Sequence, residues 1–182
     1  MKNDWSIIFV KKEIYFAGGC FWGMERAFQE LNGVMETTVG YANGTADHPT
    51  YEQVCSDTTG HRETVKVVYD PEKIRLAVLL KAYFICIDPT MKNRQGEDIG
   101  SQYQTGIYTV DEESYEAVKK AAEEEKRRYP VFFTEIAMLK CFWPAEEYHQ
   151  DYLKHHPQGY CHIAAREFEQ IRQLNQEGAM NV

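Results

Sequence analysis

The sequence lacks the features that would build a disulfide scaffold, a membrane span or a nucleic-acid surface. It holds 5 cysteines in 182 residues, an odd number and too few for a fold held by disulfides. Asp and Glu number 28 against 20 Lys and Arg, and the net charge of −8 argues against nucleic acid or anionic lipid as a partner. Near its start the chain has only a short apolar run at 7–10, whereas a signal peptide needs about 7–15 apolar residues and a membrane helix about 20. We therefore expect a cytoplasmic protein with reduced thiols and no membrane partner.

Motifs for nucleotides and metals are also missing. The sequence contains no P-loop and no GxGxxG stretch, so nothing in it supports nucleotide binding. It has no CxxC pair, and the densest group of Cys and His, between Cys141 and His162, has spacings that fit none of the usual zinc ligand pairs. We expect no metal site.

Aromatic side chains are present in surplus. The chain has 12 Tyr, 9 Phe and 3 Trp, which make up 13% of its residues. Together with 43% hydrophobic and 26% charged residues, this composition is typical of a folded domain with a core and excludes disorder. The length suits one domain, so we expect residues 1–182 to form a single domain ending in a helical tail at 163–182.

Short strands alternate with amphipathic helical patterns along the chain. Apolar runs and period-two alternation predict strands at 13–17, 34–41, 61–69, 103–110 and 134–140. Apolar residues at helical spacing and capping residues predict helices at 20–33, 76–87, 111–128, 144–155 and 163–176. Polar loops are expected at 42–60 and 88–101. The alternation predicts a sheet layered with helices.

Cys20 has the most informative surroundings. Gly18-Gly19 ends a predicted strand, and Cys20 then opens a predicted helix. A thiol there lies at the positive end of the helix dipole, close to unpaired backbone N–H groups, and both favour the nucleophilic thiolate. This position is typical of a reactive thiol, and a buried cysteine in a tight turn is the alternative.

Glu63 is the candidate partner of Cys20. It shares strand parity with Val65, Val67 and Tyr69, so its side chain should point to the buried side at the end of the strand. A carboxyl desolvated there keeps its proton near neutral pH and can act as an acid. By pattern alone, a surface Glu at a frayed strand end is the more common outcome.

The other four cysteines have different surroundings. Cys161 follows a Pro- and Gly-containing stretch, and we expect a mobile loop from which its thiol could move towards another thiol; an idle exposed Cys is the alternative. Cys86 lies within an apolar helix and is expected in the core. Cys55 is also expected to be buried. Cys141-Phe-Trp repeats the Cys-Phe-Trp that begins at Cys20, but without the flanking glycines, and we interpret the repeat as coincidence.

Gly18-Gly19-Cys20-Phe21-Trp22-Gly23-x-Glu25 opens a series of short motifs that resembles the type-A peptide methionine sulfoxide reductases. The matches follow in the same order over about residues 13–162. The further motifs are Gly40-Tyr41, Pro49-Thr50-Tyr51, Val54-Cys55-Ser56, Thr59-Gly60-His61-x-Glu63, Asp88-Pro89-Thr90, Arg94-Gln95-Gly96-x-Asp98-x-Gly100-x-Gln102-Tyr103, Ala145-Glu146-x-x-His149-Gln150-x-Tyr152-Leu153 and Gly159-Tyr160-Cys161. The tail at 163–182 has no counterpart among these motifs, and we assign it no function.

The resemblance implies an α+β fold, a single-domain two-layer sandwich in which helices pack on a ferredoxin-like mixed sheet. It implies an oxidoreductase of protein repair under oxidative stress, which reduces the S epimer of methionine sulfoxide, free or within proteins and peptides. No metal or organic cofactor is needed, because an external thiol reductant, thioredoxin, supplies the electrons. We expect the enzyme to be a monomer.

The resemblance also implies roles for individual residues. Cys20 would attack the sulfoxide sulfur, and Glu63 would protonate the sulfoxide oxygen, with Tyr51 and Tyr103 as further donors. The resulting sulfenic acid on Cys20 would condense with Cys161 to a disulfide, which thioredoxin then reduces.

Four more positions would form the substrate pocket. Phe21 and Trp22 would seat the methyl group on sulfur, and Asp98 and Tyr152 match other positions that line the family's pocket. Some relatives relay the disulfide to a further cysteine near the C-terminus, but residues 162–182 contain none. The relay should therefore involve two cysteines.

Two other classes of protein remain open. A cysteine hydrolase, with Cys20 activated by His61 or His149, would turn over without a reductant, whereas a reductase would stall after one turnover. A non-catalytic thiol- or metal-binding module would instead hold a stoichiometric metal such as zinc.

Overall fold

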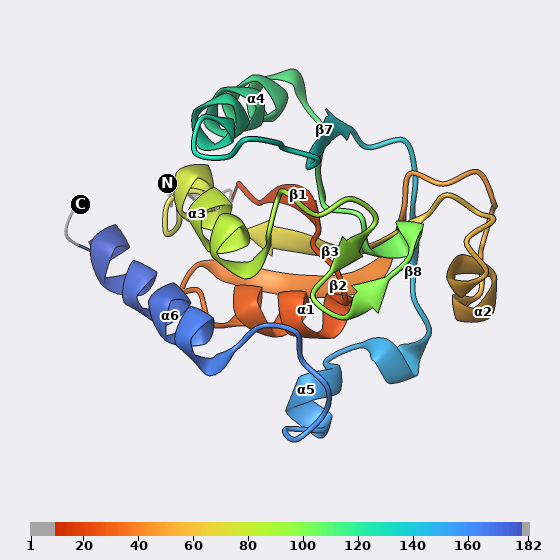
Figure 1. Cartoon of the computed structure of the whole chain (residues 1–182). Helices are drawn as coiled ribbons and strands as arrows, with labels where there is room; N and C mark the ends of the chain where they lie inside the picture. Colours follow the sequence, from red (N-terminus) through yellow and green to blue (C-terminus); the bar gives the residue numbers. More distant parts are fainter. Residues whose placement is uncertain (1–9, 180–182) are drawn as a thin grey trace, which may run out of the picture.

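Six strands pair into one mixed sheet in the computed structural model, which describes residues 10–179 (Figure 1). Most of the apolar run at 7–10 lies outside the described residues. The strands stand in the order β7-β6-β1-β3-β2-β8. β6 and β7 are parallel, and the other neighbouring pairs are antiparallel. The bounds are β1 Lys12–Ala17, β2 Val34–Ala42, β3 Arg62–Tyr69, β6 Gly106–Thr109, β7 Glu135–Met138 and β8 Phe142–Pro144.

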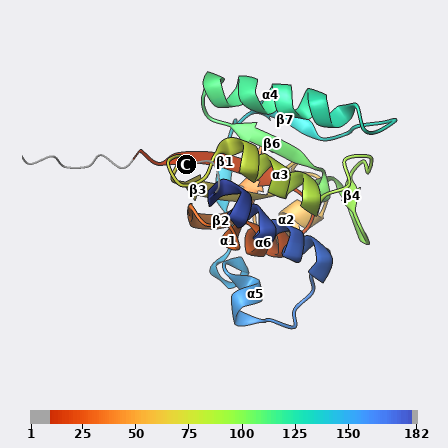
Figure 2. The ribbon, with the colours of Figure 1, turned by 90° about the vertical axis from the view of Figure 1, so that its left-hand side faces the viewer.

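Helices α1, α3 and α6 pack together beside the sheet, and α4 runs along β6 and β7 (Figure 2). The helix bounds are α1 Phe21–Gln29, α2 Tyr51–Cys55, α3 Leu76–Cys86, α4 Glu112–Lys126, α5 Tyr152–His155 and α6 Ala165–Ala179. Two 3₁₀ turns, Ser101–Tyr103 and Glu147–His149, and a small hairpin of β4 Arg94–Gln95 and β5 Asp98–Ile99 complete the set.

The two faces of the sheet have separate cores, because side chains alternate along each strand. On β1, Ile14 and Phe16 join the main core under the helices, whereas Tyr15 and Ala17 belong to a small cluster on the opposite face. The helical layer therefore covers one face. The expected α+β arrangement, a mixed sheet with helices packed on it, is confirmed.

The expected helix over 144–155 is wrong in its first half. Phe142–Pro144 forms edge strand β8, which pairs with β2 through Trp143 and Tyr41. The chain then makes a 3₁₀ turn, and Asp151 takes a positive φ of 52° before α5 begins. The strand forms because β2 offers a free edge, a long-range pairing that local helical spacing does not reveal. The expected loops also contain α2 and the β4–β5 hairpin.

The C-terminal helix α6 is an integral part of the core, although its sequence suggested only a polar tail. Ile171 and Leu174 are buried. Asn175 accepts a hydrogen bond from the Asn32 N–H at 2.8 Å and donates one to the Glu30 carbonyl, also at 2.8 Å. These bonds satisfy backbone groups that the end of α1 leaves unpaired. Between residues 10 and 179, no helix is both long enough and apolar enough to cross a membrane.

Asp111 caps α4, as expected, and this cap can be tested apart from any activity. Its carboxylate accepts hydrogen bonds from the Ser114 N–H at 2.8 Å and the Ser114 hydroxyl at 2.9 Å, and the first of these lowers the pKa of Asp111. We expect Asp111→Ala to lower the free energy of unfolding by about 1 kcal/mol in urea denaturation at pH 7. Asp111→Asn, which can still cap, should lose much less, and equal losses in the two variants would contradict the cap.

Candidate active site

The turn between β1 and α1 presents the first candidate residue. Gly19 has a φ of +82°, which favours glycine, and a Cβ on Gly18 would lie 2.6 Å from the Met24 side chain. Cys20 follows as the N-cap residue of α1, as its sequence predicted, but its side chain makes no capping hydrogen bond. The two glycines therefore set the backbone path that brings the Cys20 sulfur to the start of the helix.

Glu63 makes the hydrogen bond that Cys20 does not. It lies near the start of β3 and is only 2% exposed, on the buried side, as predicted from strand parity. Its Oε2 accepts a hydrogen bond from the backbone N–H of Phe21, the first residue of α1, at 3.1 Å. A carboxyl from a distant strand thus satisfies one of the unpaired donors of the helix, directly beside Cys20.

Burial keeps the Glu63 carboxyl protonated near neutral pH. Loss of solvent raises its pKa to about 8, the Phe21 hydrogen bond opposes that rise, and nearby Asp98 adds to it. The direction of this shift is the one expected for an acid that holds its proton near neutral pH. At neutral pH the site therefore contains a carboxylic acid, which can donate a hydrogen bond or a proton.

The Cys20 thiol is also protonated in this resting state, against the expectation from the helix dipole. Burial raises its pKa well above the usual value, the Glu63 charge raises it further, and the Trp22 backbone N–H lowers it. The helix terminus lowers the pKa of Cys20, as expected, but Cys20 is only 7% exposed, and the loss of solvent raises the pKa by more. Because Glu63 is neutral near pH 7, its charge does not oppose ionisation of Cys20 there.

Two tyrosines from separate elements face this pair. Tyr51 opens α2 and Tyr103 closes a 3₁₀ turn, and both are partly buried. Burial is the main cause of the raised pKa of each phenol, and the charges of Glu63 and Cys20 contribute in both cases. Both phenols therefore stay protonated and can donate hydrogen bonds, and in the resting structure the Tyr51 hydroxyl interacts with the Cys55 sulfur.

Aromatic rings form the next part of the site. Trp22 stacks on Tyr152 with ring centroids 3.7 Å apart, and its indole N–H donates to His149 Nδ1 at 3.1 Å. Buried His149 also contacts the rings of Phe21 and Tyr51, with ring centroids 5.1 and 4.8 Å apart, respectively. From the sequence, His149 was considered only as a base that could activate Cys20, and its packing role was not predicted. His149 lies three residues before Tyr152 in the same sequence motif, and this proximity could have indicated that the two side chains share the site.

Asp98 connects the acid to the loop that carries Cys161. It lies in β5 and accepts a hydrogen bond from the Tyr160 hydroxyl at 2.9 Å. Its charge raises the pKa of both Glu63 and Cys20, so it lies near both. Tyr160 was in the sequence motif but had no predicted role.

Cys161 lies against the turn of α1 that starts at Cys20. A Cβ on Gly23 would be 2.9 Å from the Cys161 sulfur, and Gly23 is one turn after Cys20. Cys161 is partly buried in the segment between α5 and α6, and it contributes to the raised pKa of Cys20. The loop location was predicted, whereas the contact with α1 was not.

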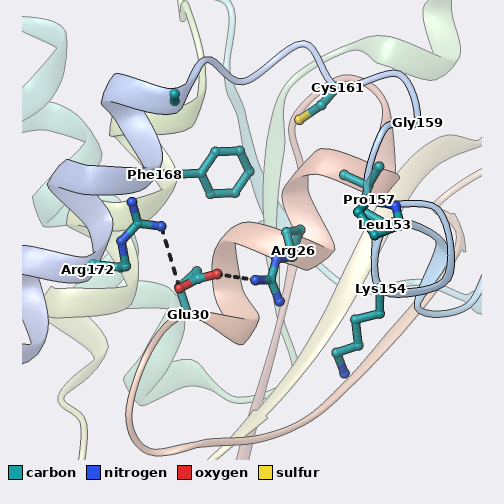
Figure 3. A pocket seen from close by; sticks show the side chains of 10 residues that line it. Arg26, Glu30, Leu153, Lys154, Pro157, Gly159, Cys161, Phe168 and Arg172 are labelled. Atoms are coloured by element: carbon teal, nitrogen blue, oxygen red, sulfur yellow. Dashed lines mark ion pairs between the residues drawn. The ribbon is translucent and has the colours of Figure 1, made fainter.

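An open groove of about 550 Å³ begins at Cys161 and runs along α1 and α6 (Figure 3). Phe168 forms an apolar wall, and Glu30 pairs with Arg26 at 2.7 Å and with Arg172 at 3.8 Å. The Cys161 thiol can therefore be approached from the side of the groove.

The remaining cysteines have structural surroundings, with one correction. Cys86 is buried in α3, as predicted. Cys55 is exposed, so the expectation of a buried thiol is wrong: α2 turns Val54 inward and leaves Cys55 on its outer side. Cys141 lies 3.6 Å from the Gly44 carbonyl, away from the start of α1. Within the described part of the chain, no three His, Cys, Asp or Glu side chains are grouped to hold a metal ion.

His61 serves the loop before β3. Its Nδ1 accepts a hydrogen bond from the Gly44 N–H at 3.1 Å, and its Nε2 lies 2.7 Å from the Ala46 carbonyl. Both ring nitrogens are thus engaged by backbone, and the ring is not available as a base for Cys20.

Comparison with known proteins adds independent information. A family model described as peptide methionine sulfoxide reductase matches residues 12–179, including α6. The chain is 52% identical over 153 residues to the peptide methionine sulfoxide reductase MsrA of Clostridium acetobutylicum, covering 84% of this chain and 94% of that protein. The structure of reduced Mxr1 from Saccharomyces cerevisiae matches with a TM-score of 0.79 at 37% identity. The match covers 83% of this chain and 88% of the Mxr1 chain. Mxr1 in complex with Trx2 has a TM-score of 0.57 at 26% identity, with coverage of 78% and 84%.

The buried Glu63 carboxyl predicts a pH-dependent stability. Its pKa is raised in the folded state from 4.5 to about 8, so the unfolded chain ionises first and folding loses stability as pH rises between these values. Glu63→Gln keeps an acceptor for Phe21 and has no proton to lose. We expect the variant to gain thermal stability relative to wild type as pH rises from 4.5 to 8, and to differ little below that range.

The measurement is the melting temperature of both proteins across that pH range. Glu123→Gln, at an exposed position of α4, serves as the matched control and should follow wild type throughout. Parallel curves of melting temperature against pH for Glu63→Gln and wild type would show that the Glu63 carboxyl ionises normally. That result would contradict the claim that Glu63 keeps its proton near neutral pH.

Proposed function

The chain belongs to the peptide methionine sulfoxide reductase family, and on that premise we propose that Cys20 reduces the S epimer of methionine sulfoxide with Glu63 as the acid. The chain is a peptide methionine sulfoxide reductase, an oxidoreductase of protein repair. One observation carries the assignment of its site residues: a buried Glu63, whose pKa is raised to about 8, bonds the helix start that presents Cys20.

The acid is needed because a sulfoxide oxygen leaves only after it has gained a proton. Glu63 supplies that proton from its neutral form, and the hydroxyl groups of Tyr51 and Tyr103 hydrogen-bond the same oxygen. Glu63 is buried and the two tyrosines are partly buried in the resting structure, so they interact strongly with charge that develops on the oxygen. Their raised pKa values keep all three groups protonated for this task.

The Cys20 sulfur supplies the electron pair. It attacks the sulfoxide sulfur to form a sulfur–sulfur bond, and the protonated oxygen leaves the substrate as water. A water molecule then attacks the Cys20 sulfur, the sulfur–sulfur bond breaks, and methionine departs from a Cys20 sulfenic acid. The balance is one thiol and one sulfoxide giving one sulfenic acid and one thioether, methionine. The Trp22 backbone N–H favours the ionised sulfur as it forms, and neutral Glu63 does not repel it.

The aromatic wall selects how the substrate enters. Phe21 and the Trp22–Tyr152 stack offer an apolar seat for the methyl group on sulfur. With oxygen directed to the Glu63 side and methyl to the aromatic side, only one configuration at sulfur leaves the remaining chain pointing outward. We assign this configuration to the S epimer because of the resemblance to type-A enzymes. Asp98 helps to shape the pocket by holding Tyr160.

Cys161 resolves the sulfenic acid in the second half of the cycle. Its sulfur rests against the Cys20 turn and opens onto the groove, so it can form a disulfide with Cys20 and release water. A thioredoxin then reduces the disulfide by exchange. The complex of the relative Mxr1 with Trx2 supports this choice of reductant. The relay that we propose uses the two thiols of Cys20 and Cys161.

Cysteine hydrolysis is the competing function, and the backbone bonds of His61 argue against it. His149 accepts the Trp22 indole N–H and packs among rings, which gives it a positioning role. Incubation with a sulfoxide substrate, with and without a dithiol, separates the two functions. Steady turnover without reductant would reject the reductase cycle, and stalling after one turnover supports it.

Substitution of the two thiols should divide the cycle into its halves. We expect Cys20→Ser to form no methionine, because the nucleophile is lost. Cys161→Ser should form one methionine per enzyme and then fail to cycle with thioredoxin. Rapid-quench measurement of methionine per enzyme checks both results, and Cys141→Ser is the matched control because its thiol lies away from α1. Loss of cycling in Cys141→Ser instead would reject Cys161 as the resolving thiol.

Removal of the acid should slow the chemical step. We expect Glu63→Gln to form methionine in the first turnover about 10²-fold more slowly than wild type at pH 7, because a positioned general acid contributes about that much or more. The measurement is the single-turnover rate at saturating sulfoxide, with exposed Glu52→Gln on α2 as the control. An unchanged first-turnover rate in Glu63→Gln would remove Glu63 from the mechanism.

A further inference from the structure

We propose that His162 is a catalytic residue of the resolving step: it accepts the proton of the Cys161 thiol and returns it to the hydroxide that leaves the Cys20 sulfenic acid. This role rests on the proposed function, in which Cys161 resolves a sulfenic acid on Cys20. It concerns only the second half of the cycle and leaves the reduction of the sulfoxide to Cys20 and Glu63.

The His162 ring lies along the first turn of α1. A Cβ on Gly19 would be 3.3 Å from His162 Nε2, and a Cβ on Gly23 would be 3.5 Å from His162 Nδ1. Cys20 lies between these two glycines in the chain. The Cys161 sulfur is 2.9 Å from the same point on Gly23, so the thiol and the ring share one turn of helix with the nucleophile. A side chain at position 19 would crowd the ring, and one at position 23 would crowd the Cys161 sulfur.

Both ring nitrogens of His162 are buried and lack a hydrogen-bond partner in the described part of the chain. An unpaired buried nitrogen is unfavourable, so most buried histidines are bonded as His61 is. The Gly18 carbonyl lies near the ring and favours its protonated form, although the contact lacks normal hydrogen-bond geometry. The ring is therefore held in place by packing, with its nitrogens free to take part in proton transfer.

The charges around His162 suit a base that is neutral at rest. Burial lowers its pKa below 6.5, and the Asp98 carboxylate from β5 and the Gly18 carbonyl from the β1–α1 turn oppose that shift. The neighbouring thiols, Cys20 and Cys161, are protonated at neutral pH. The ring can thus accept a proton, and Asp98 and Gly18 stabilise the imidazolium that results.

A base is needed because burial raises the pKa of the Cys161 thiol above 9.0, and little thiolate exists near pH 7. As His162 takes the proton, the Cys161 sulfur attacks the Cys20 sulfur, the disulfide bond forms and the sulfur–oxygen bond breaks. The hydroxide collects the proton from His162 and leaves as water. The Cys161 sulfur is oxidised, the Cys20 sulfur is reduced, and His162 returns to its neutral form.

His162→Gln tests the role because glutamine keeps a polar side chain of similar size but cannot act as a base. Two rates are measured after mixing with methionine sulfoxide in the absence of reductant: methionine formation, and loss of free thiol with mass mapping of the Cys20–Cys161 disulfide. We expect methionine formation within twofold of wild type and disulfide formation about 10²-fold slower at pH 7. His155→Gln, at an exposed position of α5, should match wild type in both rates.

The pH dependence separates a base from a structural support. The deficit of His162→Gln should shrink as pH rises, because hydroxide then ionises Cys161 directly, while wild type changes little. The Asp98 charge from β5 acts on the ring, and the Cys20 and Cys161 thiols belong to the same turn of α1 and to its own loop; all three are present in both proteins. In His162→Ala, added imidazole should restore disulfide formation at pH 7, which keeps the test open if glutamine disturbs the loop.

Disulfide formation at the wild-type rate in His162→Gln at pH 7 would overturn the role. So would a deficit that stays constant with pH and does not respond to imidazole in His162→Ala, because such a deficit reports lost packing. Failure of wild type itself to form methionine would overturn the proposed function. The rate of methionine formation shows that outcome, and it is examined before the rates of disulfide formation are compared.

Discussion

The hydrogen bond from the Phe21 N–H to the buried Glu63 carboxyl is the contact on which the site depends. It joins the first turn of α1 to the start of β3, 42 residues away, at 3.1 Å. The same burial that makes this contact raises the pKa of Glu63 to about 8 and keeps the Cys20 thiol protonated. Reduction of a sulfoxide needs a nucleophile and an acid side by side, and the fold provides both within one desolvated contact.

The chain between β8 and α6 completes the site by returning to α1. Glu25 on α1 accepts hydrogen bonds from the Asp151 N–H at 2.9 Å and the Thr37 hydroxyl at 3.0 Å, which holds the start of α5. Tyr152 then stacks on Trp22, and the following loop seats Cys161 on the same helix. One short helix therefore carries the proposed nucleophile, the proposed aromatic seat and the contact surface of the proposed resolving thiol, which would bring both halves of the cycle to one place.

Local sequence signals predicted the parts of the site that depend on local geometry. The Gly-Gly turn located Cys20 at a helix start, and strand parity predicted the burial of Glu63. Features that depend on tertiary contacts were predicted wrongly. Pro144 was expected to open a helix, but it ends strand β8, which pairs with the edge of β2. Cys55 was expected to be buried, but it faces solvent because α2 packs on the core through Val54. The dipole argument for a thiolate at Cys20 failed for the same reason, since burial by distant chain segments cannot be read from the residues next to it.

The central claim is that Glu63 holds a proton at neutral pH beside Cys20, and isotope-edited infrared spectroscopy tests it directly. With ¹³C-labelled glutamate, the difference between wild type and Glu63→Gln isolates the carboxyl stretch of this one residue. We predict the protonated carbonyl band at pH 6 and its conversion to carboxylate with a midpoint near 8. A carboxylate band already present at pH 6, with a midpoint near the ordinary value of 4.5, would contradict the account.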